Sequence, residues 1–397
     1  MDKSINYDAF KRAYNDFDPR ELKGEDLKKF YVDELAKDSI GRIINTIDIT
    51  ERYRKILVIG HRGCGKTTIL NKVAEELKNR YHVVFFSLTG VLGFYEVEPI
   101  DILLTTYLMV LESGKNRARF FAAALDAFGK MIEPLAQRLK IKEIGLDLFH
   151  VISARFTIES GSRQIIRNEL GKQINKLQQN LSLACSDIAG QTKKEVLIII
   201  DNIDKIAHQF AERIFIRESG LMTDPGVKII YTLPLETFYQ GAFNTVRERY
   251  SDEFIPPVPF KEIHPLCKED LVPHLRTLVW RRIDKSLVTE DALETLIKLS
   301  GGLLRDLISY LQDACKVAIL DKSPVIDPAV AKRVKARHVN EYYRLFDAPV
   351  YEEAVRSFLD AGKRIPNTLL TSLLNELFIL EYRWCDDLWY DAHPCLK

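Results

Sequence analysis

Eight consecutive residues in the first fifth of the chain have the types and spacing of a phosphate-binding loop. They read Gly60-His61-Arg62-Gly63-Cys64-Gly65-Lys66-Thr67, which completes a G-x-x-x-x-G-K-[ST] pattern. Glycines let the backbone curl until its N–H groups point inward, where they hold phosphate oxygens. We expect Lys66 to reach the β- and γ-phosphates, Thr67 to ligate Mg²⁺, and the backbone through Thr68 to line the site. The pattern predicts a nucleotide-binding protein with ATP and Mg²⁺ as cofactors.

The neighbouring sequence predicts the elements that such a loop needs. The apolar run Lys55–Ile59 indicates a buried strand that ends at Gly60, and Thr67–Ala74 has apolar positions at helical spacing. A helix that begins at the loop adds the positive potential of its N-terminus to the phosphate site. This order disfavours the alternative of a glycine-rich turn that binds nothing.

A second group of candidate residues follows Val196–Ile200, five apolar residues that predict a fully buried parallel strand. Asp201, where the strand emerges, is placed to hold Mg²⁺ through its water shell. A general base usually comes next, but that residue is Asn202, and an amide cannot take a proton from water. We therefore expect slow hydrolysis. Asp204 is the nearest carboxylate, either a substitute base or a solvated, helix-capping residue.

Two further residues are candidate sensors of the γ-phosphate. Thr232 ends the predicted strand Val227–Thr232, although threonine is also common in ordinary strands. Arg305 follows Ser300-Gly301-Gly302 near the start of a predicted lid helix. It either reports the nucleotide state by moving the helical domain or simply pairs with Asp306.

Arg247 and Arg249 lie between the fourth and fifth predicted strands. In a ring or filament they would reach the γ-phosphate of a neighbouring subunit, as an arginine finger does. The alternative is that both are solvated residues of a charged loop.

Strands that alternate with helices predict an α/β fold, a parallel-sheet P-loop NTPase core. Besides the three strands above, His82–Phe86 indicates a second strand and the proline-rich Ile255–Phe260 a fifth, at the sheet edge. Ligands of such sheets bind beyond the carboxyl ends of the strands, where Gly60, Asp201 and Thr232 fall.

Helices are predicted for most of the remaining chain. About a hundred residues between the second and third strands carry helical patterns, at Ile100–Leu111, Arg117–Leu139 and Arg163–Cys185. The apolar stripe of the last piece suits a helix packed on its own domain better than a coiled coil, because it is shorter than three heptads. The sequence after Lys268 is all-helical until a hairpin pattern at Phe378–Asp391.

These patterns divide the chain into four predicted domains. The boundaries are a helical segment at 1–40, the P-loop core at 41–262 with an insertion at about 92–190, a helical lid at 263–347 and a winged-helix-like domain at 348–397.

Composition is that of an ordinary globular protein. The chain has 397 residues, of which 46% are apolar and 28% charged, and a formal net charge of +1. A charge so near zero gives no global attraction to nucleic acid or membrane. Six scattered cysteines suggest buried thiols in a reducing cytoplasm, and the longest apolar stretch is too short to cross a bilayer.

Together these residues resemble the AAA+ ATPases, nearest to the origin-initiator and STAND branches. The resemblance covers Phe30 to about Leu320 and rests on the phosphate loop, the Leu197–Asp204 segment, Thr232 and Gly302–Arg305. The segment Trp389–Pro394 also resembles the winged-helix end of bacterial conflict-associated ATPases. The resemblance implies nucleotide-dependent assembly and switching. Two features depart from it, Asn202 and the long helical insertion, and the insertion is where we expect partner specificity.

Two functions follow from this resemblance. The first is a molecular switch, a homo-oligomer that assembles or releases a protein effector when it binds ATP, in bacterial defence or signalling. The second is a DNA-acting ATPase of the initiator or transposition-regulator type. From Val350 onward five basic side chains face eight acidic ones, and Asn367–Glu376, the predicted recognition helix, has no basic residue. Such a surface repels phosphate, so the switch is favoured. A third function, a small-molecule kinase, is disfavoured because such an enzyme needs neither a lid arginine nor a winged helix.

Overall fold

The computed structural model describes residues 6–50, 54–92, 96–114, 118–140, 156, 160–260, 270–345, 349–361, 367–384 and 387–397. The chain forms two compact units that each combine distant parts of the sequence. The first unit comprises Met1–Gly41, Ile59–Lys72 and Phe254–Lys397, and the second comprises Arg42–Val58 and Val73–Glu253.

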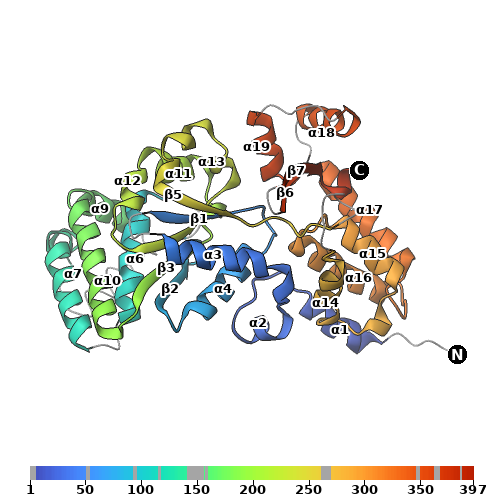
Figure 1. Cartoon of the computed structure of the whole chain (residues 1–397), viewed down its shortest axis with the longest axis horizontal. Coiled ribbons are helices and arrows are strands. Elements are labelled where there is room, and N and C mark those ends of the chain that lie inside the picture. The colour runs from blue at the N-terminus through green and yellow to red at the C-terminus, as the bar shows by residue number, and fades with distance from the viewer. Residues whose placement is uncertain are drawn as a thin grey trace. The chain divides into compact units, whose positions relative to one another are not determined.

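The second unit is built on a five-stranded sheet in the order β2-β3-β4-β1-β5 (Figure 1). Its strands are β1 (Lys55–Ile59), β2 (Tyr81–Ser87), β3 (Glu195–Asp201), β4 (Lys228–Thr232) and β5 (Tyr250–Phe254). The pairs β2–β3, β3–β4 and β4–β1 are all parallel, with Ser87 opposite Asp201 and Thr232 opposite Val58. Parallel pairing brings the carboxyl ends of these strands to one edge, as the sequence predicts.

The predicted fifth strand is wrong in position. Strand β5 is Tyr250–Phe254, and Ile255–Phe260, which we expected to be the strand, lies beyond its end. Pro256, Pro257 and Pro259 have no N–H to donate to a ladder, so the paired segment is the more polar one that precedes them.

The predicted insertion between β2 and β3 is a group of helices that packs on the sheet (Figure 1). It contains α6 (Pro99–Gly114), α7 (Ala118–Arg138), α9 (Ser160–Gly171) and α10 (Ile174–Thr192). Helices α6 and α10 contact β2, and α10 also contacts β3. The single helix predicted at Arg163–Cys185 is wrong, because the backbone leaves the helical conformation at Gln173, just after Gly171. Glycine is a weak helix former and favours a break there.

One buried ion pair fastens this insertion. The Arg167 guanidinium donates from Nε to Asp101 at 2.8 Å and also contacts Glu98 at 3.2 Å. The Arg167 and Asp101 side chains are 7% and 1% exposed. Ile166, Leu170, Leu177 and Leu181 of the predicted apolar stripe are buried in the same unit, as expected for helices packed on their own domain.

The other helices of the second unit are short connections. They are α5 (Leu88–Leu92), α11 (His208–Glu212), α12 (Ser219–Thr223) and α13 (Leu235–Phe238). Helix α3 (Lys37–Ile49) and helix α4 (Lys66–Leu77) each begin in the first unit and continue into the second.

The first unit is mainly helical. It contains α1 (Tyr7–Asp16), α2 (Gly24–Phe30), α14 (Val272–Trp280), α15 (Glu290–Leu299), α16 (Leu304–Leu320) and α17 (Pro328–Arg344). Helix α1 packs on α16. Phe10 of α1 and Phe17, the residue just after it, enter one apolar core with Leu275 and Leu311. Asp327 caps α17, accepting from the Val330 N–H at 2.9 Å.

The chain ends in two helices and a hairpin, the order predicted for a winged helix. They are α18 (Pro349–Ala361), α19 (Asn367–Asn375), β6 (Ile379–Trp384) and β7 (Asp387–Ala392). Strands β6 and β7 pair antiparallel (Figure 1). We call α19, β6 and β7 the C-terminal module. Within the described part of the chain, no helix combines the length and the apolar character that crossing a bilayer requires.

Candidate nucleotide site

The phosphate loop has the curled backbone that its glycines predict. Gly63 and Gly65 have φ of +90° and +95°. Lys66 is the first residue of α4, and its Nζ donates to the carbonyl oxygens of Gly60 at 2.8 Å and His61 at 3.0 Å. An ammonium group held by carbonyls inside such a loop is close to where phosphate oxygens would bind. The loop therefore fits a nucleotide polyphosphate.

The lid helix α16 touches this loop. The Arg305 N–H donates to the Gly63 carbonyl at 3.1 Å. A Cβ atom on Gly63 would lie only 3.0 Å from the Arg305 Cβ, so a glycine is needed both for its positive φ and for this approach. The Arg305 side chain is exposed. Asp306 accepts from the Tyr342 hydroxyl at 3.0 Å and pairs with His393, so the structure does not support the alternative of an Arg305–Asp306 pair.

His61 connects the same loop to the C-terminal module. Its Nε2 accepts from the Glu381 N–H at 2.7 Å, so the proton must be on Nδ1, which donates to the Leu374 carbonyl 3.2 Å away. The imidazole is fully buried, and burial, together with the Lys66 ammonium, lowers its pKa to about 3. His61 is therefore neutral. Sequence reasoning placed it in the phosphate site and had no signal for this second contact.

Thr68 is tied to the N-terminal segment. Its hydroxyl accepts from the Leu22 N–H at 3.1 Å, and Asn71 one turn later donates to the Leu22 carbonyl at 3.0 Å. This pair of bonds holds the N-terminal segment along α4. The Thr68 side chain thus positions the chain, and only its backbone is left for the predicted role in the loop.

The candidate residues of the second unit lie at the carboxyl edge of the sheet. Asp201 ends β3 and is 1% exposed. Asn202 has a left-handed backbone with φ of +64°, and its Nδ2 donates to the Ser87 hydroxyl at 2.8 Å. Ser87 is the last residue of β2, and no motif singled it out in the sequence.

Thr232 joins β4 to the turn after β3. Its hydroxyl accepts from the Ile203 N–H at 3.0 Å and is fully buried. Asp204 lies in that turn, the 3-10 helix Ile203–Lys205. The structure therefore brings Asp201, Asn202 and Thr232 to one edge. It shows Thr232 bracing this edge, whereas its role as a sensor stays a prediction.

Arg247 and Arg249 flank the start of β5. Arg247 lies over the Phe238 ring, 4.8 Å from its centroid, and pairs with Asp252 at 3.6 Å. Arg249 donates to the Ser219 hydroxyl at 3.2 Å. Both side chains thus have partners within the second unit.

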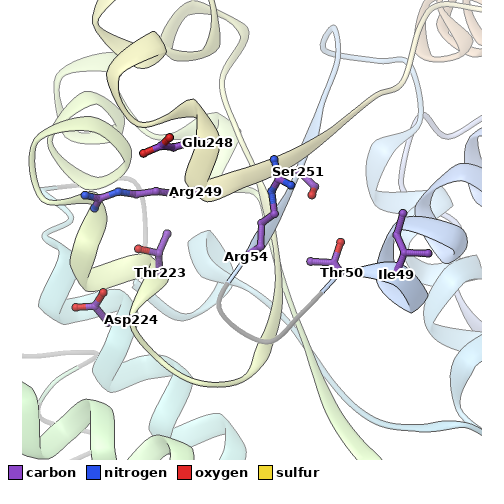
Figure 2. A pocket seen from close by; sticks show the side chains of 8 residues that line it. All are labelled: Ile49, Thr50, Arg54, Thr223, Asp224, Glu248, Arg249 and Ser251. Atoms are coloured by element: carbon purple, nitrogen blue, oxygen red, sulfur yellow. The ribbon is translucent and has the colours of Figure 1, made fainter.

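Arg249 also lines an open cavity of about 830 Å³ in the second unit. Figure 2 shows the residues around it, which are Ile49, Thr50, Arg54, Thr223, Asp224, Glu248, Arg249 and Ser251. Arg54 precedes β1, and Asp224 lies just before β4. The cavity is consequently at the amino ends of these strands, the opposite edge from Asp201 and Thr232, and its mixed charges do not favour a polyphosphate.

Comparison with known proteins confirms the predicted resemblance to AAA+ ATPases, and it does not resolve a branch of them. Residues 50–230 match the family model described as an AAA domain. This match and the parallel sheet confirm the predicted fold class of an AAA+-like P-loop NTPase. None of the curated proteins matches the sequence.

Several solved structures are similar over most of their length, at low identity. Cdc6p from Pyrobaculum aerophilum is 13% identical, with 96% of this chain and 94% of that chain covered and a TM-score of 0.39. Drosophila ORC bound to DNA is 10% identical, with 99% of this chain and 90% of that chain covered and a TM-score of 0.44. The Thermotoga maritima RuvB Holliday junction branch migration motor is 13% identical, with 92% of this chain and 93% of that chain covered and a TM-score of 0.37. Likenesses this distant transfer neither an activity nor a partner to this chain.

Proposed function

We propose that this chain, whose residues 50–230 match the AAA domain family, is an ATP-binding and slowly hydrolysing molecular switch. In this proposal ATP binding drives homo-oligomer assembly or the release of a protein effector. One observation carries the proposal. The phosphate loop that would bind ATP directly contacts both the lid helix α16, through Gly63, and the C-terminal module, through His61. A ligand in the loop would therefore bias the elements that move in a switch.

The proposed roles follow the chemistry of each residue. Lys66 would bind the β- and γ-phosphates, while Thr67 and Asp201 would hold Mg²⁺. When bound, Mg²⁺–ATP supplies a γ-phosphoryl group that water can attack. Arg305 would contact the γ-phosphate and pass its presence to the lid. The sequence contains no motif that would read the base, so the choice of ATP over GTP is itself part of the proposal.

Slow hydrolysis is proposed from the residue after Asp201. Asn202 is an amide whose Nδ2 is held by Ser87, so it can orient water but cannot accept a proton. Asp204, in the turn that follows, is the proposed substitute base. A site with a weak base suits a protein that keeps ATP bound and reports its presence.

Partners and biological role are the finer part of the proposal. The likeness of Trp389–Pro394 to conflict-associated ATPases supports a role in defence or signalling. The predicted compartment is the cytoplasm. Arg249 and Arg247 would act in trans within the oligomer. In the DNA-acting alternative, the basic residues of α17 would contact the DNA. They are Lys332, Arg333, Lys335 and Arg337. However, Arg333 pairs with Asp321, and Arg337 pairs with Asp313 at 3.1 Å.

Oligomeric state measured by light scattering, with ADP, ATP and a non-hydrolysable analogue, tests the proposal. We expect the analogue to change the assembly of the wild type and to leave Lys66→Ala unchanged. Lys72→Ala is the matched control, because it removes another ammonium from α4 that pairs with Asp33 at 3.1 Å. A Lys66→Ala protein that still binds ATP and assembles would contradict the switch. Tight, salt-dependent duplex binding would favour the DNA-acting alternative.

A further inference from the structure

The contact between the phosphate loop and the C-terminal module uses both nitrogen atoms of one side chain. His61 donates to Leu374, one of the last four carbonyls of α19, and accepts from Glu381 in β6. Carbonyls at the end of a helix lack an intrahelical partner, and an edge strand offers unpaired N–H groups. A single buried imidazole thus bonds backbone groups of both elements. They are the Glu381 N–H and the Leu374 carbonyl, which also accepts from the Leu377 N–H at 3.4 Å.

The surroundings of His61 add a second layer to this contact. Glu381 is fully buried and accepts from Arg383 Nε at 2.7 Å, and the Arg383 guanidinium lies 4.0 Å from the centroid of the Phe254 ring. Phe254 in turn meets His61 edge-on, with ring centroids 6.4 Å apart. The module is therefore held against the loop by a charged and aromatic cluster centred on one histidine.

The same histidine also takes part in holding Lys66. The His61 carbonyl accepts from Lys66 Nζ at 3.0 Å and from the Cys64 thiol at 2.9 Å. A phosphate ligand would compete with this carbonyl for the ammonium, because charge-assisted bonds to phosphate are stronger than bonds to a neutral carbonyl. The backbone of His61 would then lose one of the bonds that fix it.

We propose that His61 is a positioning residue that couples the phosphate loop to the C-terminal module, so that binding of a nucleoside di- or triphosphate releases the module. This inference rests on the proposed function, since it requires that the loop bind nucleotide. Coupling between two sites is reciprocal, so a module that nucleotide releases must itself weaken nucleotide binding while docked. The docked module acts as an autoinhibitory contact.

The amide hydrogen of Glu381 gives a direct readout, because it donates to His61 itself. Hydrogen exchange of the β6 segment, followed by mass spectrometry on the full chain, measures its protection. We expect saturating ATP with Mg²⁺ to lower this protection about tenfold, within the range of ordinary coupling energies. His61→Ala should show the same low protection without nucleotide. Its nucleotide affinity, measured by calorimetry, should be about tenfold higher than that of the wild type.

Two further variants separate coupling from a loss of structure. Leu388→Ala is the control, since it truncates a side chain of β7 that is 53% exposed. It should leave both readouts unchanged. Arg383→Met removes the partner of Glu381 without altering the loop. It should lower β6 protection and raise nucleotide affinity about threefold, and it keeps the test valid if His61→Ala does not fold.

The outcomes distinguish this inference from the proposed function. A wild-type chain that binds no nucleotide overturns both. Nucleotide binding with unchanged β6 protection, and with affinities of His61→Ala and Arg383→Met within twofold of the wild type, overturns the coupling alone. Higher affinity together with lower protection supports it.

Discussion

The phosphate loop and the carboxyl edge of the sheet are held in place by different kinds of contact. The loop is bonded to residues far along the sequence. The His61 side chain bonds Leu374 and Glu381, and the Gly63 carbonyl accepts from the Arg305 N–H. The residues at the edge are braced by neighbouring strands, as Asn202 is by Ser87 and Thr232 is by the turn after β3.

This difference suggests a division of labour. An edge braced by adjacent strands keeps its carboxylate in one place, which suits a metal ligand. A loop that touches a lid helix and a C-terminal module can pass a change at the phosphates to these two elements.

Lys66→Ala should weaken nucleotide binding about a thousandfold, because it removes charge-assisted bonds of about 1.5–3 kcal/mol each. Calorimetric titration with ATP measures the loss. Lys72→Ala, on the same helix, should stay near the wild type. If both variants bind ATP equally well, the loop is not the nucleotide site, and its contacts with α16 and the C-terminal module are not linked to nucleotide binding.

Asp201→Asn should lower the hydrolysis rate about a hundredfold, since the substitution removes the charge that we assign to Mg²⁺. Binding of ATP measured in the presence of EDTA should be unchanged, because the phosphates are then held by the loop alone. A phosphate-release assay with Mg²⁺ checks the hydrolysis rate, and calorimetric titration with ATP in EDTA checks the binding. Equal rates for Asp201→Asn and wild type would show that the edge is only structural.

Acid should separate the C-terminal module from the loop. Docked His61 has a pKa of about 3, whereas a solvated histidine titrates near 6.5. The undocked state therefore binds a proton first, so docking is fully stable above about pH 6.5 and weakens towards pH 3. The loss is about 1.4 kcal/mol, or tenfold, for each pH unit. Lys66 and His393 also oppose a charge on His61, and Arg383 lies nearby.

Tryptophan fluorescence in a Trp280→Phe background measures this undocking, because the other two tryptophans, Trp384 and Trp389, are in β6 and β7. We expect the signal to change between pH 6.5 and 5. In His61→Gln, which cannot titrate there, that change should be absent. A transition of the same size in both proteins would exclude His61 as its cause.

Thr232→Val should have the smallest effect, a loss of about 1 kcal/mol of stability, because the buried Ile203 N–H loses its acceptor. Thermal unfolding followed by circular dichroism measures it. Thr232→Ser keeps the oxygen and should differ little from the wild type. If hydrolysis falls in the valine variant well beyond this loss of stability, Thr232 acts as the predicted sensor as well as a brace.

Much of the fold could be predicted from local patterns. The apolar runs that became β1, β3 and β4 are buried in the sheet at nearly the predicted boundaries, because a strand covered on both faces needs consecutive apolar residues. Prediction of β5 failed because Tyr250–Phe254 is polar for a strand, while the more apolar residues after it are rich in proline. The break between α9 and α10 was missed because the apolar stripe continues past Gly171 at helical spacing.

Local sequence is enough to predict the chemistry of the loop, because the glycines, Lys66 and Thr67 are adjacent and their proposed roles depend on local backbone geometry. It also determined the α/β class, since periodicity and strand burial are local properties. Three contacts are visible only in the folded chain. The His61 side chain bonds the C-terminal module, Ser87 holds Asn202, and α1 joins the core of the lid. The two His61 contacts join residues 313 and 320 positions apart, and no local pattern encodes which distant backbone groups a side chain will meet.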